Sequence, residues 1–123
     1  MKRFVLASLA GLASLGALAA TAAPAPRDGC FLTRDLRSHT VDAANHAIYL
    51  DVKGVETYQV TTRDNCLATA ITTEGITVRD WGLGQICRPL DLEIIVRGNH
   101  CNIASLTRLT PAQASALPKR LQP

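Results

Sequence analysis

The sequence predicts a small all-β domain, a five- or six-stranded antiparallel barrel or sandwich with a short C-terminal helix, and of the two we favour the barrel. Three observations support this prediction. Short segments in which apolar and polar residues alternate recur about every 8 to 12 residues, as they do in small barrels and sandwiches. Turn signals rich in Gly, Asp and Asn separate these segments. Four cysteines in so short a chain indicate that disulfides stabilise the domain.

The first 22 residues have the three parts of a cleaved signal peptide. Lys2 and Arg3 form a basic start, and residues 4–18 are apolar or small. Ala20-Thr21-Ala22 then supplies the small residues that signal peptidase requires. The alternative is an uncleaved membrane anchor, but the apolar run is short and rich in Ala and Gly, which favours cleavage.

A lipid anchor at Cys30 is a second alternative. Arg27-Asp28-Gly29 precedes this cysteine, where a lipid-acceptor site needs an aliphatic residue and small neighbours. We therefore expect a periplasmic or secreted protein that has no stable membrane insertion after cleavage. Its parts are a Pro/Ala linker (residues 23–29), one disulfide-stabilised β domain (residues 30–117) and a tail (residues 118–123).

Cleavage of the signal peptide also changes the charge of the protein. Removing 22 of the 123 residues takes away two of the 13 basic residues, so 11 basic and 10 acidic residues remain. A net charge near +1, with Lys and Arg scattered singly, provides no electrostatic footprint for nucleic acid. Nucleic-acid binding is therefore disfavoured.

All four cysteines lie in the mature part, and an even count in a small exported chain predicts two disulfides. A four-cysteine metal site is the competing interpretation, but no Cys-x-x-Cys pair is present. Thiol redox catalysis is disfavoured by the same spacing. Of the three possible connectivities we prefer Cys30–Cys101 with Cys66–Cys87. The first bond would tie the amino-terminal strand to the final hairpin, and the second would close a local loop of the chain.

The first half of the domain contains three predicted strands, which are Leu36–Val41, Ala47–Val52 and Glu56–Thr62. A turn over residues 42–45 joins the first two strands. Between the second and third, a three-residue loop with Gly54 in a left-handed conformation would pair Leu50 with Tyr58 and Ile48 with Val60. A two-residue loop would put these apolar side chains on opposite faces, so the longer loop is preferred.

The second half contains shorter elements. Strands are expected at Ala70–Thr73 and Ile76–Arg79, followed by a flexible connection over residues 81–84. Thr110-Pro111 is a helix start signal, with Thr as the N-cap and Pro at the first helical position. The helix is predicted at Pro111–Leu117.

A hairpin between these elements spans Asp91 to Leu106, and apolar residues alternate along both of its arms. If a four-residue turn joins the arms, Val96 lies opposite Cys101 and Ile94 faces Ile103. Cys101 then points into the core. Cys66 and Cys87 lie in the segment that precedes the hairpin.

The order of these short pieces resembles that of one small family. The pieces are Cys30-Phe31, Val41-Asp42, Tyr49-Leu50, Tyr58-x-Val60, Cys66-Leu67, Ile86-Cys87, Cys101-x-Ile103 and Leu109-Thr110. Over about Cys30 to Leu117 the chain is similar to a family of small secreted or lipid-anchored proteobacterial envelope proteins that share a domain of unknown function. The resemblance implies an envelope location and a compact, disulfide-bearing β domain. It implies no activity.

The residues that catalysis would need do not form a recognisable pattern. None of the serines lies in a Gly-x-Ser-x-Gly elbow, and the adjacent Ser38 and His39 would lie on opposite faces of a strand. Asp91 and Glu93 share one face of a strand and are expected to be its solvated side. The histidines, His39, His46 and His100, lack metal-ligand spacing. No motif predicts a cofactor.

Trp81 is the single tryptophan of the chain and precedes a Gly-Leu-Gly turn. In one interpretation its ring closes one end of the barrel. In the other it is an exposed platform for a ligand or partner, and Trp is enriched at such sites. The sequence favours the first interpretation, because a small chain with few aromatic residues has a modest core and needs its largest side chain there. If the ring is exposed, Arg79 and Arg88 on either side of the loop would suit an anionic partner.

Together these observations favour a non-enzymatic binding or interaction module of the periplasm or envelope, whose partner is an envelope protein or a small ligand. The alternative is a small hydrolase or metal-handling protein that uses His39, His46 or His100. The arrangement of titratable side chains separates the two, because their convergence in one pocket would favour the enzyme and their scatter would favour the module.

Overall fold

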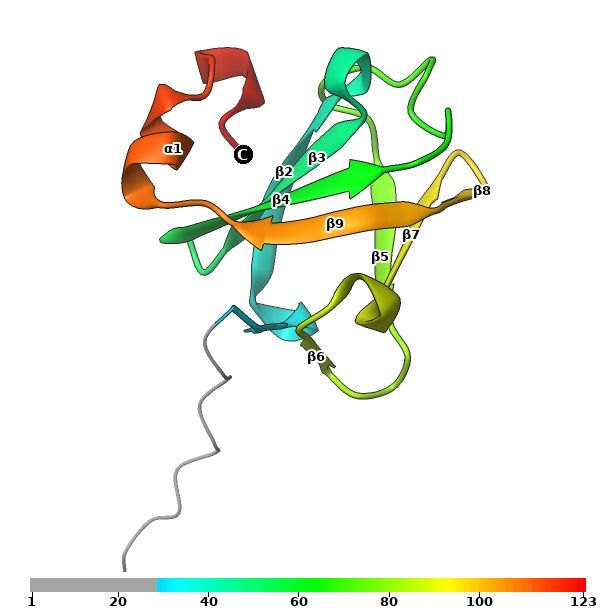
Figure 1. Ribbon diagram of the computed structural model, residues 1–123, viewed down its shortest axis with the longest axis horizontal. Coiled ribbons are helices and arrows are strands. Elements are labelled where there is room, and N and C mark those ends of the chain that lie inside the picture. The colour runs from blue at the N-terminus through cyan, green and yellow to red at the C-terminus, as the bar shows by residue number, and fades with distance from the viewer. Residues whose placement is uncertain (1–28) are drawn as a thin grey trace, which may run out of the picture.

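The computed structural model describes residues 29–123, and these form nine strands in three antiparallel sheets with one short α-helix near the C-terminus (Figure 1). The predicted signal peptide and linker residues 23–28 lie outside the described residues. The prediction of an all-β domain with a C-terminal helix is confirmed. The strands pack as a sandwich of separate sheets, so the favoured closure into one barrel is wrong, and there are more strands than expected.

The sheets have the strand orders β2-β3-β4-β9, β5-β7-β8 and β1-β6. The strands are β1 Phe31–Leu32, β2 Leu36–Asp42, β3 Ala47–Val52, β4 Glu56–Thr62, β5 Ile76–Asp80, β6 Gln85–Ile86, β7 Leu92–Val96, β8 Asn99–Cys101 and β9 Ile103–Arg108. The helices are α1 Pro111–Ala116 and the 3₁₀ turns η1 Thr33–Asp35, η2 Ala43–Asn45, η3 Pro89–Asp91 and η4 Lys119–Leu121. Within the part of the chain that the structure describes, no helix is long and apolar enough to span a bilayer.

The strands β2, β3 and β4 lie where the sequence predicts them. Leu50 pairs with Tyr58 and Ile48 with Val60, as the three-residue loop requires. Gly54 in that loop has a φ of 75°, a left-handed conformation that a side chain disfavours. The hydrophobic pattern and the loop chemistry therefore agree on this register.

One hydrophobic core joins all three sheets. Its largest fully buried members include Phe31, Ile48, Leu50, Tyr58, Ile86 and Ile94. A second, smaller cluster lies on the other face of the four-stranded sheet, where Leu121 packs with Ala47 and Tyr49 of β3. The C-terminal segment that carries α1 and η4 reaches this face (Figure 1). β3 is thus buried on both faces, and for that reason its sequence is almost continuously apolar.

The helix α1 also forms as predicted, and it ends one residue earlier than expected. The Thr110 hydroxyl accepts a hydrogen bond from the Gln113 amide, and the Gln113 side chain accepts one from the Thr110 amide. This reciprocal pair is a capping box, which satisfies amide groups that the helix itself cannot.

The predicted strand at Ala70–Thr73 is wrong. This segment belongs to a run of tight turns, in which the Ala70 amide donates to the Leu67 carbonyl and the Glu74 amide to the Ile71 carbonyl. Leu67 is fully buried and anchors the run. Since local hydrogen bonds already pair these backbone groups, they are not available for a strand ladder.

The final hairpin has a shorter loop than predicted. Arg97 and Gly98 alone connect β7 to β8, and both have positive φ, as the favoured two-residue hairpin turns require. Ile94 therefore lies opposite Cys101, two residues away from the expected register. A shift of two residues keeps the same side chains on the same face, so Cys101 is still buried. Beyond Asn102, Ile103 pairs with Thr62 of β4 and so joins a different sheet.

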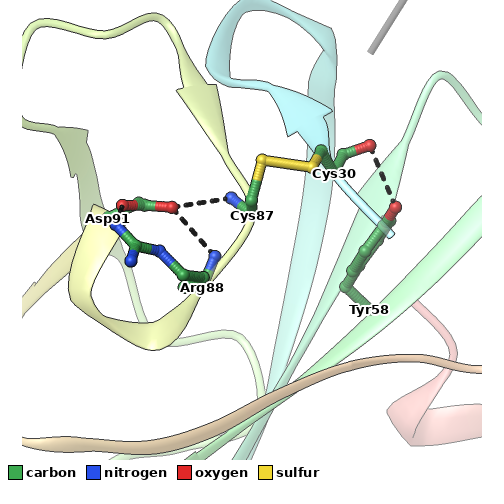
Figure 2. The surroundings of a disulfide bond; sticks show 5 residues. All are labelled: Cys30, Tyr58, Cys87, Arg88 and Asp91. Atoms are coloured by element: carbon green, nitrogen blue, oxygen red, sulfur yellow. Dashed lines mark hydrogen bonds and ion pairs between the residues drawn. A yellow bond between two sulfur atoms is a disulfide. The ribbon is translucent and has the colours of Figure 1, made fainter. Parts of the chain in front are cut away.

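The preferred disulfide connectivity is also wrong. The structure pairs Cys30 with Cys87 and Cys66 with Cys101, with Cα–Cα distances of 4.2 Å and 5.4 Å. The first bond extends the β1–β6 ladder, in which Phe31 lies opposite Ile86, so that Cys30 continues that register onto Cys87 (Figure 2). Strands of two residues are too short to show a hydrophobic period in the sequence, so this long-range pairing could not be predicted from it.

Candidate functional site

The Trp81 side chain is exposed, with 65% of its surface accessible, so the interpretation of this ring as a cap on the core is wrong. The preceding Asp80 holds the loop in place: its carboxylate accepts hydrogen bonds from the Thr33 hydroxyl and from the Gly82 amide at 2.8 Å. The Thr33 hydrogen bond, followed by that of Gly82, lowers the pKa of Asp80. A fixed turn, rather than the core, therefore orients the tryptophan.

Trp81 lines an open groove of about 450 Å³. The groove is lined by Arg63, Trp81, Pro89, Leu90, Leu92, Cys101, Asn102 and Ile103. Leu90 reaches this groove from η3 and is 79% exposed. Leu83, also in the tryptophan loop, is 70% exposed but does not line the groove. Two large apolar side chains from separate segments thus face solvent at one concave site.

One wall of the groove is η3, and Asp91 holds this turn in place. One Asp91 oxygen accepts hydrogen bonds from the amides of Cys87 (3.1 Å) and Arg88 (2.9 Å), and the other is 3.2 Å from the Arg88 guanidinium (Figure 2). The Arg88 side chain and then the Cys87 amide lower the pKa of Asp91. Because Asp91 is buried and bonded, the adjacent Leu90 is held outward.

Another part of the lining, Arg63, Cys101 and Asn102, is braced by Asp64 and the second disulfide. The Asp64 carboxylate accepts hydrogen bonds from the amides of Cys66 (3.3 Å) and Asn102 (3.0 Å), and the Arg63 amide donates to the Asn102 carbonyl. Asp64, Cys66 and Cys101 are the one group in residues 29–123 whose side chains lie close enough together to hold a metal ion. The disulfide uses both sulfur atoms, so this group is a structural brace.

The basic residues predicted for this site, Arg79 and Arg88, flank its lining segments in the sequence. Arg88 is paired with Asp91, and Arg79 lies on β5 opposite Glu93 of β7. Neither lines the groove. The basic residue that does is Arg63, which sequence reasoning missed, as it missed Leu90, because both come from segments that only the tertiary structure brings to Trp81.

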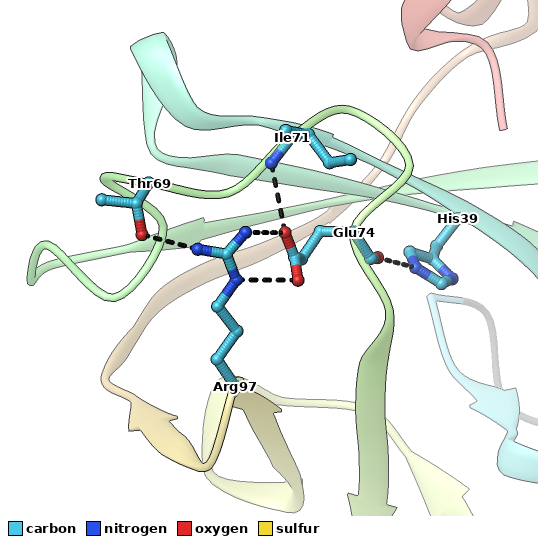
Figure 3. A network of polar contacts seen from close by, with 5 residues as sticks. All are labelled: His39, Thr69, Ile71, Glu74 and Arg97. Carbon is cyan, nitrogen blue, oxygen red and sulfur yellow. Dashed lines mark hydrogen bonds and ion pairs between the residues drawn. The ribbon is translucent and has the colours of Figure 1, made fainter.

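The three histidines do not converge on one point. His39 lies on β2, where its Nε2 is 2.7 Å from the Glu74 carbonyl oxygen (Figure 3). His100 on β8 is 2.7 Å from the Glu93 carboxylate, and His46 occupies a left-handed position at the end of η2. The Ser38 hydroxyl contacts Asp51 at 3.4 Å rather than its neighbour His39. None of these contacts pairs a serine with a histidine.

The Glu74 side chain belongs to a separate ion pair. Arg97 donates two hydrogen bonds to its carboxylate, at 2.9 Å and 2.7 Å, and a third to the Thr69 hydroxyl at 3.0 Å (Figure 3). The Arg97 bonds lower the pKa of Glu74. This pair ties the β7–β8 loop to the run of turns before β5, a structural role.

Comparison with models of protein families, with curated proteins and with solved structures finds no match to this chain. The resemblance to a family of envelope proteins therefore stays a prediction.

Proposed function

We propose that this protein is a non-enzymatic binding module of the cell envelope, and that it holds a segment of a partner protein in the groove beside Trp81. The observation that carries this proposal is the joint exposure of Trp81 and Leu90 on one groove. Contiguous exposed apolar surface commonly marks an interaction site, and tryptophan is enriched among the residues that dominate binding energy.

The charge of the groove indicates the chemistry of the partner. Arg63 is the charged residue among those that line it, and within residues 29–123 its side chain has no ion-pair partner. A partner segment with apolar side chains next to an Asp or Glu would place the carboxylate on Arg63 and the apolar side chains against Trp81 and Leu90. Such a segment is the occupant we propose.

Two observations support the envelope location. Both disulfides are of the kind that persists in oxidising compartments such as the periplasm. The predicted signal peptide would deliver the chain there. The dispersion of His39, His46 and His100 supports a binding role over the hydrolase or metal-handling alternative, since catalytic groups act together in one pocket.

The test replaces Trp81 by Ala and installs a photo-crosslinking residue at the exposed Leu83 beside the groove. We expect the crosslink to one envelope protein to weaken by at least tenfold, because a central interface Trp commonly contributes 2 kcal/mol or more. The free energy of unfolding should change by less than about 0.5 kcal/mol, since the ring is exposed.

The matched control is Val55→Ala. Val55 is another exposed apolar residue, and it lines a different pocket, near α1. This variant should leave both crosslinking and stability unchanged. A Trp81→Ala protein that crosslinks as well as the wild type would contradict the proposal.

A further inference from the structure

The edge strands β2 and β5 belong to different sheets and form no ladder with each other, but residues of both line one cavity. Contacts join them at one end, where the Val41 amide donates to the Thr72 carbonyl at 2.9 Å and His39 contacts the Glu74 carbonyl. Contacts join them again at the other end, where Thr33 binds Asp80 through its hydroxyl and the Gly84 carbonyl through its amide. We call the stretch between these ends the β2–β5 slit.

The end contacts share one antiparallel register. Val41 meets Thr72 and His39 meets Glu74, both just before β5, and six residues away along each segment Thr33 of η1 meets Asp80 at the end of β5. An uninterrupted ladder would continue that register through the middle. Instead, β2 has a bulge between Leu36 and His39, and a bulge leaves its extra residue out of the ladder and bends the strand. The slit opens at this bulge.

A cavity of about 260 Å³ occupies the slit. Its apolar side chains come from both sheets and are Leu36, Leu50, Ile76 and Val78. Its polar side chains are Thr33, Arg37, Ser38 and His39. Half of the lining residues are apolar and half are polar, which suits a ligand that has both an apolar chain and a polar group. The cavity shares no lining residue with the groove beside Trp81.

The charge of the side chains that line the slit indicates which kind of ligand it would bind. No lining residue is acidic, and Arg37, which lines the cavity from an exposed position, has no ion-pair partner among the described residues. Of the nearby carboxylates, Asp35 pairs with Lys53, whereas Asp51 and Asp80 accept hydrogen bonds from the lining hydroxyls of Ser38 and Thr33 and are not themselves part of the lining. The unpaired cation at the cavity is therefore suited to an anionic group.

We propose that the β2–β5 slit binds a short-chain carboxylate, with the apolar chain against Ile76, Val78 and Leu50 and the carboxylate on Arg37. The hydrogen-bonded ends close the slit and restrict its occupant to a short chain. This site is independent of the partner-binding role proposed for the Trp81 groove.

The experiment is an NMR titration of the folded protein with hexanoate, using hexanol and hexylammonium as matched probes. We expect hexanoate to shift the amide signals of residues 36–39 and 76–78 in a saturable manner, and to bind at least tenfold more tightly than either matched probe. Binding of all three with equal affinity would overturn the assignment of an anionic ligand. Absence of saturable shifts, or shifts confined to the Trp81 groove, would overturn the site.

A pair of arginine variants tests the role of Arg37. Arg37→Gln should weaken hexanoate binding about tenfold, because a charge-assisted hydrogen bond to the carboxylate is lost. Arg34→Gln is the control, since Arg34 is also exposed but does not line the cavity. Both variants should unfold at the same denaturant concentration as the wild type. Equal binding by the two variants would contradict the proposal.

Discussion

Asp91 shows how one side chain sets the local structure of the proposed binding surface. Its carboxylate accepts hydrogen bonds from two backbone amides and from the Arg88 side chain, and these bonds favour its charged form. The pKa of this group is below its ordinary value of 3.8, chiefly through the Arg88 side chain and the Cys87 amide. The folded protein therefore releases this proton at a lower pH than the unfolded chain.

The sign of the pH effect follows from that shift. At pH values between the folded pKa of Asp91 and 3.8, the unfolded chain binds more protons than the folded protein. The Asp91 carboxylate therefore contributes its full stabilisation above pH 3.8, and this contribution is lost as the pH falls through the folded pKa. Asp91→Asn should be less stable than the wild type at neutral pH, and the difference should shrink in acid. Denaturant unfolding at about pH 7 and about pH 3 measures it. If the free energy of unfolding fell by the same amount in the wild type and in Asp91→Asn between these two pH values, the proposed role of the Asp91 carboxylate would be wrong.

At the scale of elements, tight loops decide how the strands pair. Gly98 follows Arg97 in the β7–β8 turn, and its φ of 79° lies in the left-handed region. That turn places Cys101 opposite Ile94, and Cys101 is one of the two cysteines in the disulfide that braces the groove. A change in this one loop is therefore expected to affect both the hairpin and the wall of the groove.

Gly98→Ala should lower the free energy of unfolding by about 1 to 2 kcal/mol, the usual cost of placing a Cβ in a left-handed conformation. Gly75→Ala is the matched control, because Gly75 does not have a positive φ and the added Cβ would meet open space. It should be neutral or stabilising, since it reduces the conformational entropy of the unfolded chain. Chemical denaturation of the two variants measures the difference, and equal stabilities would contradict this account.

At the scale of the whole molecule, two crosslinks join segments that are distant in sequence. The bonded cysteines are separated by 57 residues in Cys30–Cys87 and by 35 in Cys66–Cys101. In the chain-entropy model, each loop of this length stabilises the fold by about 4 kcal/mol. Together the two bonds are comparable to the whole stability of a small domain, about 5 to 15 kcal/mol.

Reduction with dithiothreitol should therefore lower the melting temperature strongly, as thermal unfolding with and without the reductant would show. Peptide mapping without reduction should recover Cys30 linked to Cys87 and Cys66 linked to Cys101. Equal melting temperatures would show that the crosslinks contribute little. Any other linkage would contradict the topology, because the β1–β6 ladder holds Cys30 next to Cys87.

The parts of the fold that depend on local chemistry could be predicted from the sequence. β3 and β4 have the predicted bounds, β2 extends one residue further, and the pairing of Leu50 with Tyr58 is the one predicted. These predictions succeeded because a period of two, loop length and the Gly54 conformation act within one hairpin. The helix start at Thr110-Pro111 was predictable for the same reason, since a cap involves neighbouring residues.

Which distant segments meet depends on long-range packing, which the sequence pattern does not show. The pairing of Cys30 with Cys87 depends on a two-residue ladder, and the switch of the chain at Asn102 divides an apparently single strand between two sheets. The exposure of Trp81 was decided in the same way: the core is already filled by residues such as Phe31 and Tyr58, and Asp80 holds the loop outside it. Periodicity records whether a side chain faces the core, but not which long-range neighbour completes the packing there.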